Sequence, residues 1–164
     1  MRFRKTTRDA QINLVLTTNP NKVVWSGTPE QLAAQALHVK ELVTFRQTFS
    51  DLVMAYEQIE TSIAVSQPDR VRLYHVGPFI HVPFQSTDDP IDISLPQDVL
   101  SALVLPRFLD RLSVLKFMNV HDDQDMVLFS YLSSIGMTSR VGKGDLDFSL
   151  EGKAQTKAQL ADLL

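Results

Sequence analysis

The sequence contains no cysteine. This absence excludes disulfide bonds, thiolate metal ligands and cysteine nucleophiles. Long apolar runs are also missing, since no stretch approaches the about 18 apolar residues of a transmembrane helix. The basic residues near the N-terminus are not followed by an apolar stretch of signal-peptide length. We therefore expect a soluble, cytoplasmic protein that does not enter a membrane.

Catalytic motifs are equally scarce. The sequence has no Gly-x-Ser-x-Gly elbow or other serine-hydrolase signature. Gly142 and Lys143 resemble the end of a phosphate-binding loop, but five residues rather than four separate Gly136 from Gly142. Gly144 also stands where that loop has a Mg²⁺-binding Ser or Thr. We predict a hairpin turn at this position, no catalytic residues and no cofactor.

An acidic cluster at residues 121–125 raises the question of a metal site. Its carboxylate oxygens suit Mg²⁺, but the cluster lacks the glycine and glutamate positions of an EF-hand. The interpretation we favour is that Asp122 caps a helix and that the neighbouring acids complement the helix dipole. For His75 and His81 the sequence offers no third zinc ligand. No metal site is therefore predicted.

Length and composition are those of an ordinary globular domain. The chain has 164 residues, of which 44% are hydrophobic and 21% charged, and a net charge of −3. This charge argues against a uniformly basic nucleic-acid-binding protein, although it permits a local basic patch. We expect a basic flexible leader at residues 1–9 and a single domain at residues 10–164.

Strand-like and helix-like patterns follow each other in blocks. The predicted hairpins pair residues 11–17 with 22–26, 71–76 with 79–84, and 138–141 with 146–150. The predicted shorter helices cover residues 96–118, 122–134 and 153–164. Hairpins without βαβ crossovers indicate an α+β fold, in which antiparallel hairpins pack against one long helix, continuous or broken, and several shorter C-terminal helices.

The long helical pattern begins at Thr28, an N-cap residue, and Pro29, which suits the first helical position. No glycine or proline follows until Pro68. Polar residues at 47–51, with Ser50 able to cap a new helix, leave two interpretations open. The segment is one bent helix, or two helices joined near residues 47–51.

The second half of this segment carries apolar residues at spacings of three and four, which is typical of a heptad seam. We predict that the seam forms an interface with a second copy of the chain or with another protein. The alternative is that the stripe packs within its own chain. The predicted interface residues are Leu42, Phe45, Phe49, Leu52, Tyr56 and Ile59.

Basic residues suggest a second hypothesis. Arg70, Arg72 and Tyr74 are expected on one face of a strand, and cations interleaved with exposed aromatic rings on a sheet bind single-stranded nucleic acids. The acidic residues of the stretch 88–98 oppose such binding. The leader adds phosphate contacts through Arg2, Arg4, Lys5 and Arg8.

These patterns predict a non-enzymatic interaction, assembly or accessory subunit that binds itself or another protein through the long helical segment. The alternative function is a single-stranded RNA- or DNA-binding module. A weaker alternative is a divalent-metal-dependent enzyme that uses the carboxylates at residues 122–125.

Overall fold

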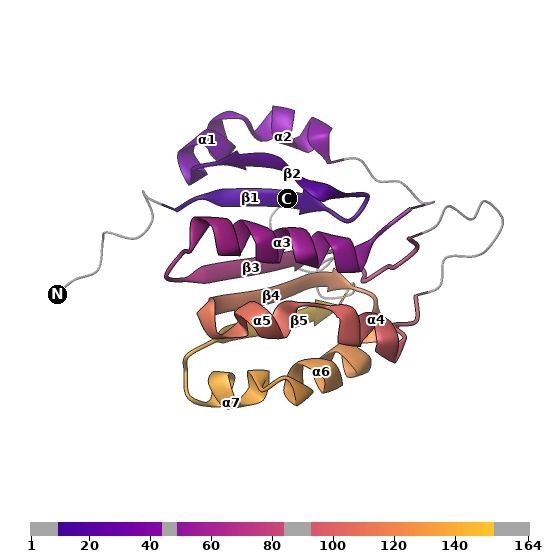
Figure 1. Ribbon diagram of the computed structural model, residues 1–164. Helices are drawn as coiled ribbons and strands as arrows, with labels where there is room; N and C mark the ends of the chain where they lie inside the picture. Colours follow the sequence, from indigo (N-terminus) through magenta and orange to yellow (C-terminus); the bar gives the residue numbers. More distant parts are fainter. Residues whose placement is uncertain (1–9, 44–48, 84–92, 153–164) are drawn as a thin grey trace, which may run out of the picture.

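The computed structural model describes residues 10–43, 49–83 and 93–152 (Figure 1). The predicted leader at residues 1–9 and the predicted helix at residues 153–164 lie outside these ranges. The fold is α+β, as the sequence predicts: it combines a two-stranded antiparallel hairpin with a three-stranded parallel sheet and several helices.

The predicted first hairpin is present, although its second strand begins at Asn19 rather than at residue 22. Strand β1 (Ile12–Leu16) pairs antiparallel with β2 (Asn19–Gly27), and Leu14 lies opposite Trp25. Two short helices follow, α1 (Pro29–Ala34) and α2 (Ala36–Leu42). The indole Nε1 of Trp25 donates to Oε1 of Gln35 at 3.0 Å and so ties the hairpin to the junction between these helices.

The start of α1 also follows the sequence signal. Thr28 Oγ1 accepts a hydrogen bond from Gln31 N at 3.2 Å, while Gln31 Oε1 accepts one from Thr28 N at 2.8 Å. This reciprocal pair is a capping box, and Pro29 occupies the first turn, where it loses no hydrogen bond.

The long segment is not one continuous helix. A third helix, α3 (Leu52–Ser66), begins only after the stretch that contains residues 44–48, which lie outside the described part. Its N-cap is Asp51, whose Oδ1 accepts from Met54 N at 2.9 Å, rather than the predicted Ser50. Ser50 instead forms a β-bridge with Val82, and this contact with a distant segment keeps Ser50 from capping the helix.

The parallel sheet is the main departure from the sequence prediction. It consists of β3 (Val71–Val76), β4 (Leu112–Val120) and β5 (Asp147–Gly152), in the order β3-β4-β5. The predicted hairpin partner of β3 at residues 79–84 is wrong, because β3 pairs with β4 in parallel instead. The predicted hairpin at 138–141 and 146–150 is also wrong, because its first half is helical and its second half pairs in parallel with β4.

Helices connect the three parallel strands. The first connection contains α4 (Gln97–Ala102), α5 (Leu105–Phe108) and the 3-10 helix η1 (Leu109–Arg111). The second contains the 3-10 helix η2 (Asp122–Gln124), α6 (Asp125–Ser134) and α7 (Met137–Gly142). The predicted helix at 96–118 therefore ends early, and its last third is the central strand β4, whose side chains alternate between a buried and a partly exposed face.

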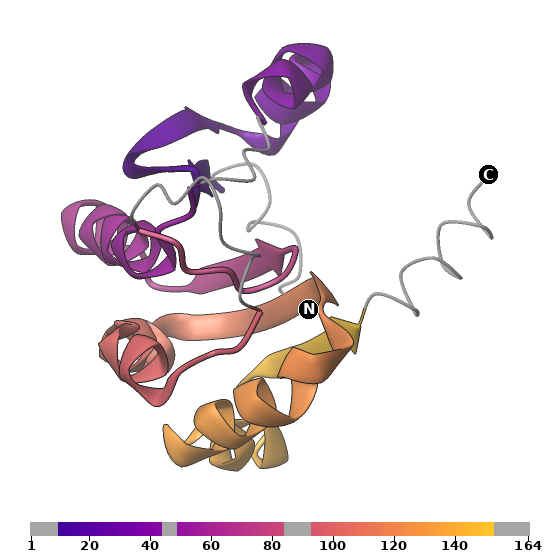
Figure 2. The same cartoon turned by 90° about the vertical axis from the view of Figure 1, so that its right-hand side faces the viewer.

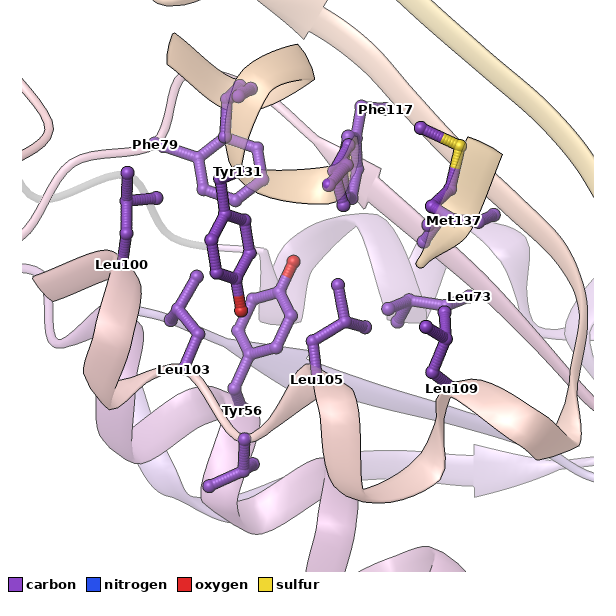
Figure 3. Close-up of a cluster of buried hydrophobic side chains, with 14 of the residues drawn as sticks. Tyr56, Leu73, Phe79, Leu100, Leu103, Leu105, Leu109, Phe117, Tyr131 and Met137 are labelled. Carbon is purple, nitrogen blue, oxygen red and sulfur yellow. The ribbon is translucent and has the colours of Figure 1, made fainter. Parts of the chain in front are cut away.

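The core lies between the sheet and these helices (Figures 2 and 3). Two crossovers of the same hand that advance in the same direction place their helices on the same face of a sheet. Figure 3 shows Tyr56 and Tyr131 among the leucines of α4 and α5. The most deeply buried side chains of this core include Leu52, Tyr56, Phe79, Leu100, Leu105, Leu115, Phe117, Leu128, Leu132 and Met137.

Within the described ranges, no helix has the length and apolar character needed to cross a membrane.

Candidate interaction surface

One face of the parallel sheet carries no helix of the described part (Figure 2). Leu73, Leu115 and Phe148 point to the helix side, where they pack in or against the core. Because side chains alternate along a strand, their neighbours point to the opposite side. We call this opposite side the open face, and its residues are Arg72, Tyr74, Val76, Val114, Lys116, Met118, Asp147, Ser149 and Glu151.

The strand register arranges the open face in three rows. Residues paired across parallel strands point to the same side of the sheet, so each row takes one residue from each strand. The rows, written in the order β3, β4 and β5, are Arg72-Val114-Asp147, Tyr74-Lys116-Ser149 and Val76-Met118-Glu151.

The apolar side chains of β3 on this face are strongly exposed. Tyr74 is 53% exposed and Val76 is 69% exposed, whereas Leu73, which lies between Arg72 and Tyr74 in the chain, is buried. Parallel sheets are ordinarily covered on both faces, because their crossover helices bury them. A face that carries no helix of the described residues and exposes apolar side chains on β3 is therefore a candidate contact surface.

Charge is distributed unevenly across the open face. Lys116 Nζ donates to Asp147 Oδ1 at 2.5 Å, so the only cation of β4 on this face leans toward β5. Arg72 on β3 forms no ion pair with any residue of the described part. The β3 edge is thus basic, and the β5 edge, with Asp147 and Glu151, is acidic.

The predicted nucleic-acid-binding residues are brought together only in part. Arg72 and Tyr74 lie on the open face, and Arg70 is exposed just before β3. Phe79, the next aromatic residue after β3 in the sequence, is fully buried in the core and is not available for stacking on a base. The four basic residues of the leader lie outside the described residues, namely Arg2, Arg4, Lys5 and Arg8.

The predicted interface residues lie mostly inside the protein. Leu52 is 0% and Tyr56 2% exposed, and Ile59 packs against the same core. Leu42 and Phe49 are partly buried, and Phe45 lies outside the described residues. In this structure the heptad spacing belongs to a helix that packs on its own sheet, which was the alternative interpretation of the stripe.

A polar cluster formed by partly buried His75 and buried Tyr56 lies beneath the end of β3. The imidazole of His75 stacks on Phe79, with ring centroids 3.8 Å apart, and its Nδ1 lies 3.4 Å from the Tyr56 hydroxyl. Burial lowers the pKa of His75 to about 4, although hydrogen bonds to the backbone of Pro78 and Gly77, which favour the protonated ring, act in the opposite direction. Burial, followed by the proximity of Tyr131, raises the pKa of the Tyr56 hydroxyl above its usual range. Both groups are therefore neutral at neutral pH, which suits a structural role.

The acidic cluster at residues 121–125 follows the carboxyl end of β4. The predicted cap at Asp122 is wrong: His121 Nδ1 accepts from Asp123 N at 3.2 Å and caps η2. Burial, and next the charge of Asp122, raise the pKa of Asp125. Among the described residues, no three His, Asp or Glu side chains are grouped so that they could hold a metal ion.

A second exposed apolar stretch lies on α6. Met126 is 77% and Phe129 49% exposed, and a shallow hollow of about 370 Å³ lies beside Met126, next to Gln97 and Tyr131. A hollow of about 350 Å³ adjoins it on the other side of Val127. The charged residues of the described part form no pattern along this stretch that would indicate which partner binds it.

Most of the open face was not predicted from the sequence. The sequence predicts a helix at Val114, Lys116 and Met118, and a hairpin at Asp147, where the structure has parallel strands. The available signal was the alternation along β4, in which Leu115 and Phe117 are buried and their neighbours are not.

Comparisons with protein-family models, with curated proteins and with solved structures give no significant match. Function must therefore be inferred from the geometry of the surface itself.

Proposed function

We propose that this protein is a non-enzymatic assembly or accessory subunit that self-associates through the open face. The observation that carries the proposal is a parallel sheet whose described helices all lie on one side, while the other side exposes Tyr74 and Val76. We infer that a second copy of the chain binds this face, because the open face carries positive charge at its β3 edge and negative charge at its β5 edge. Such a surface is complementary to itself.

The buried polar groups agree with a structural rather than a chemical role. His75 is neutral and packed between aromatic rings, and Gln124 is 1% exposed and hydrogen-bonded to main-chain atoms. Groups held in this way stabilise one conformation of the core. Nothing in their geometry presents a reactive atom to a substrate.

Sedimentation equilibrium over a wide range of protein concentration tests the proposal. We expect a reversible dimer that Val76→Asp dissociates, because the dimer interface would bury an unpaired carboxylate. Leu37→Asp is the matched control: Leu37 is 80% exposed, lies on α2 and is far from the sheet, so this variant keeps the dimer. A wild-type chain that stays monomeric at high micromolar concentration would overturn the proposal.

A second candidate function is single-strand binding, favoured by one observation. Tyr74 pairs with Lys116 in the sheet, and Arg72 precedes it on the same face, so a stacking ring lies between two cations. Asp147 and Glu151 weaken the attraction for a polyanion, and so we expect binding only at low salt.

Fluorescence anisotropy with a labelled single-stranded oligonucleotide tests this second candidate. Tyr74→Ala should weaken binding by about 1–3 kcal/mol without changing the salt dependence, because stacking releases few counterions. Arg72→Gln should instead make the salt dependence shallower by about 0.7 in the log–log slope. Lys143→Gln, on the exposed turn after α7, is the control and changes neither quantity. Absence of binding at low salt eliminates this candidate.

A further inference from the structure

The two edges of the open face carry opposite charge. Arg72 stands on β3, and exposed Arg70 precedes that strand, whereas Asp147 and Glu151 stand on β5. The central strand β4 presents Val114 and Met118 with one cation, Lys116, between them. This gradient runs across the strands rather than along them. Its direction restricts how two copies of the face can meet.

We propose that two copies pack their open faces about a twofold axis that runs parallel to β4, so that β3 of each subunit lies over β5 of the other. The inference rests on the proposed self-association and specifies its geometry. A rotation about an axis parallel to the strands exchanges the two edges of the sheet. The basic edge of one subunit then meets the acidic edge of the other, twice.

The competing twofold arrangement brings like charges together. An axis in the plane of the interface but perpendicular to the strands lays β3 over the β3 of the other copy. With this axis centred near Lys116, Asp147 would approach Glu151 of the partner subunit, and Arg72 would lie over Val76 of the partner subunit without an acidic residue opposite it. Juxtaposed like charges disfavour such an arrangement. The charge gradient therefore selects the strand-parallel axis.

The register determines which side chains meet. Arg72 and Asp147 both pair with Val114, so they lie at the same height along the strands. A rotation about the strand-parallel axis does not change the position of a residue along the strands. Arg72 therefore faces Asp147 of the partner subunit. Face-to-face sheets cross at about −30°, so the match is closest near the middle of the interface. Val114 and Met118 lie on the axis and each faces its own copy.

Lys116 also lies near the axis, where it approaches a second Lys116. Its ammonium group is held by Asp147, at 2.5 Å, on the β5 side. The charge is therefore drawn away from the axis and partly neutralised within its own subunit. This ion pair uses Oδ1 of Asp147, and a carboxylate can accept about four hydrogen bonds, which leaves capacity for an arginine from the other subunit.

Charge-reversal variants test the pairing. Arg72→Glu alone and Asp147→Lys alone should each weaken dimerisation by about tenfold, because both cross-subunit pairs become repulsive. An equimolar mixture of the two variants should restore the wild-type affinity. In the mixed dimer, one pair is Glu with Lys and the other is the original Arg with Asp. Arg111→Glu, an exposed arginine in η1, is the control and leaves dimerisation unchanged.

Chemical cross-linking tests the axis without altering any charge. The chain has no cysteine, so Val114→Cys and Met118→Cys each introduce a single thiol. Facing sheets lie about 10 Å apart, too far for a disulfide, and a short bis-maleimide is therefore the appropriate reagent. We expect each variant to cross-link with itself. If the axis is perpendicular to the strands and centred near Lys116, Val114→Cys cross-links with Met118→Cys in a mixture instead, which overturns the inference.

Val65→Cys is the matched control for cross-linking. Val65 is 81% exposed but lies on α3, on the helix side of the sheet, and should give no dimer product. Two outcomes separate self-association from its geometry. A monomeric wild-type chain refutes self-association itself, whereas a dimer that shows neither mixed-variant rescue nor self-cross-linking at Val114 and Met118 refutes only this geometry.

Discussion

The side chain of Gln124 forms two hydrogen bonds with the main chain of Phe79. Its Nε2 donates to Phe79 O at 2.7 Å, and its Oε1 accepts from Phe79 N at 2.9 Å. The same Nε2 donates to Ile93 O at 2.6 Å. Gln124 thus supplies the pairing that a neighbouring strand would otherwise give to Phe79. It fixes the segment after β3 against the start of α6.

Replacing Gln124 by Met should destabilise the protein strongly. The substitution keeps a similar shape but leaves one buried N–H and two C=O groups without their partner, and each such group costs about 1–3 kcal/mol. We expect a loss of about 3 kcal/mol or more in the free energy of unfolding, measured by urea denaturation with an unchanged m-value. Gln97→Met, at an exposed position of α4, is the control and should change stability by less than about 0.5 kcal/mol. Equal effects of the two substitutions would contradict the role of Gln124.

His75 should make stability depend on pH. Burial lowers its pKa from the usual 6.5 to about 4 in the folded protein. The unfolded chain therefore takes up a proton at a higher pH than the folded protein does. The resulting stabilisation is present above about pH 6.5 and is lost as the pH falls toward 4, by at most about 1.4 kcal/mol per pH unit.

The comparison of wild type with His75→Phe isolates this contribution. Phenylalanine keeps the stacking on Phe79 but cannot be protonated, so the variant should lose less stability than the wild type between pH 6.5 and 4. Urea denaturation at several pH values measures the difference. His38→Phe, at an exposed position of α2, should leave the pH dependence of the wild type unchanged. Parallel stability curves for wild type and His75→Phe would refute the role of His75.

Leu52 should contribute to folding rather than to association. Its side chain is 0% exposed and belongs to the core. Leu52→Ala should therefore cost about 2–5 kcal/mol of stability, because the substitution leaves a cavity. The dimer affinity of the folded variant, measured by sedimentation, should stay that of the wild type. Met54→Ala, at a 42% exposed position of the same helix, should cost much less stability. A weaker dimer without loss of stability would instead indicate that Leu52 belongs to the interface that the sequence predicts.

The local signals in the sequence were the reliable ones. Thr28 and Pro29 start α1 as predicted, because a capping box needs only residues within one turn. The hairpin of β1 and β2 follows from alternation around a short turn. The period of two along β3 also placed Arg72 and Tyr74 on one face. In each case the determining contacts lie between neighbours in the chain.

The parallel sheet could not be predicted from such local signals. β3 and β4 are separated by a connection whose described part contains α4, α5 and η1, and no local pattern indicates which distant strand a strand will pair with. The apolar run at the start of β4 suits a buried helix as well as a strand, and periodicity alone does not separate the two for short runs. In the folded protein this segment is a strand, and its Leu115 and Phe117 side chains are buried under the helices.

The sequence by itself determined the α+β class, the first hairpin, the Thr28 cap of α1, and the shared face of Arg72 and Tyr74. Only the tertiary structure decided that the seam of Leu52 and Tyr56 belongs to the core and that no helix of the described residues covers the other face of the sheet. The physical reason is that an apolar stripe specifies burial but not the surface that buries it. That surface is supplied by strands and helices far away in the chain, whose packing is cooperative and nonlocal.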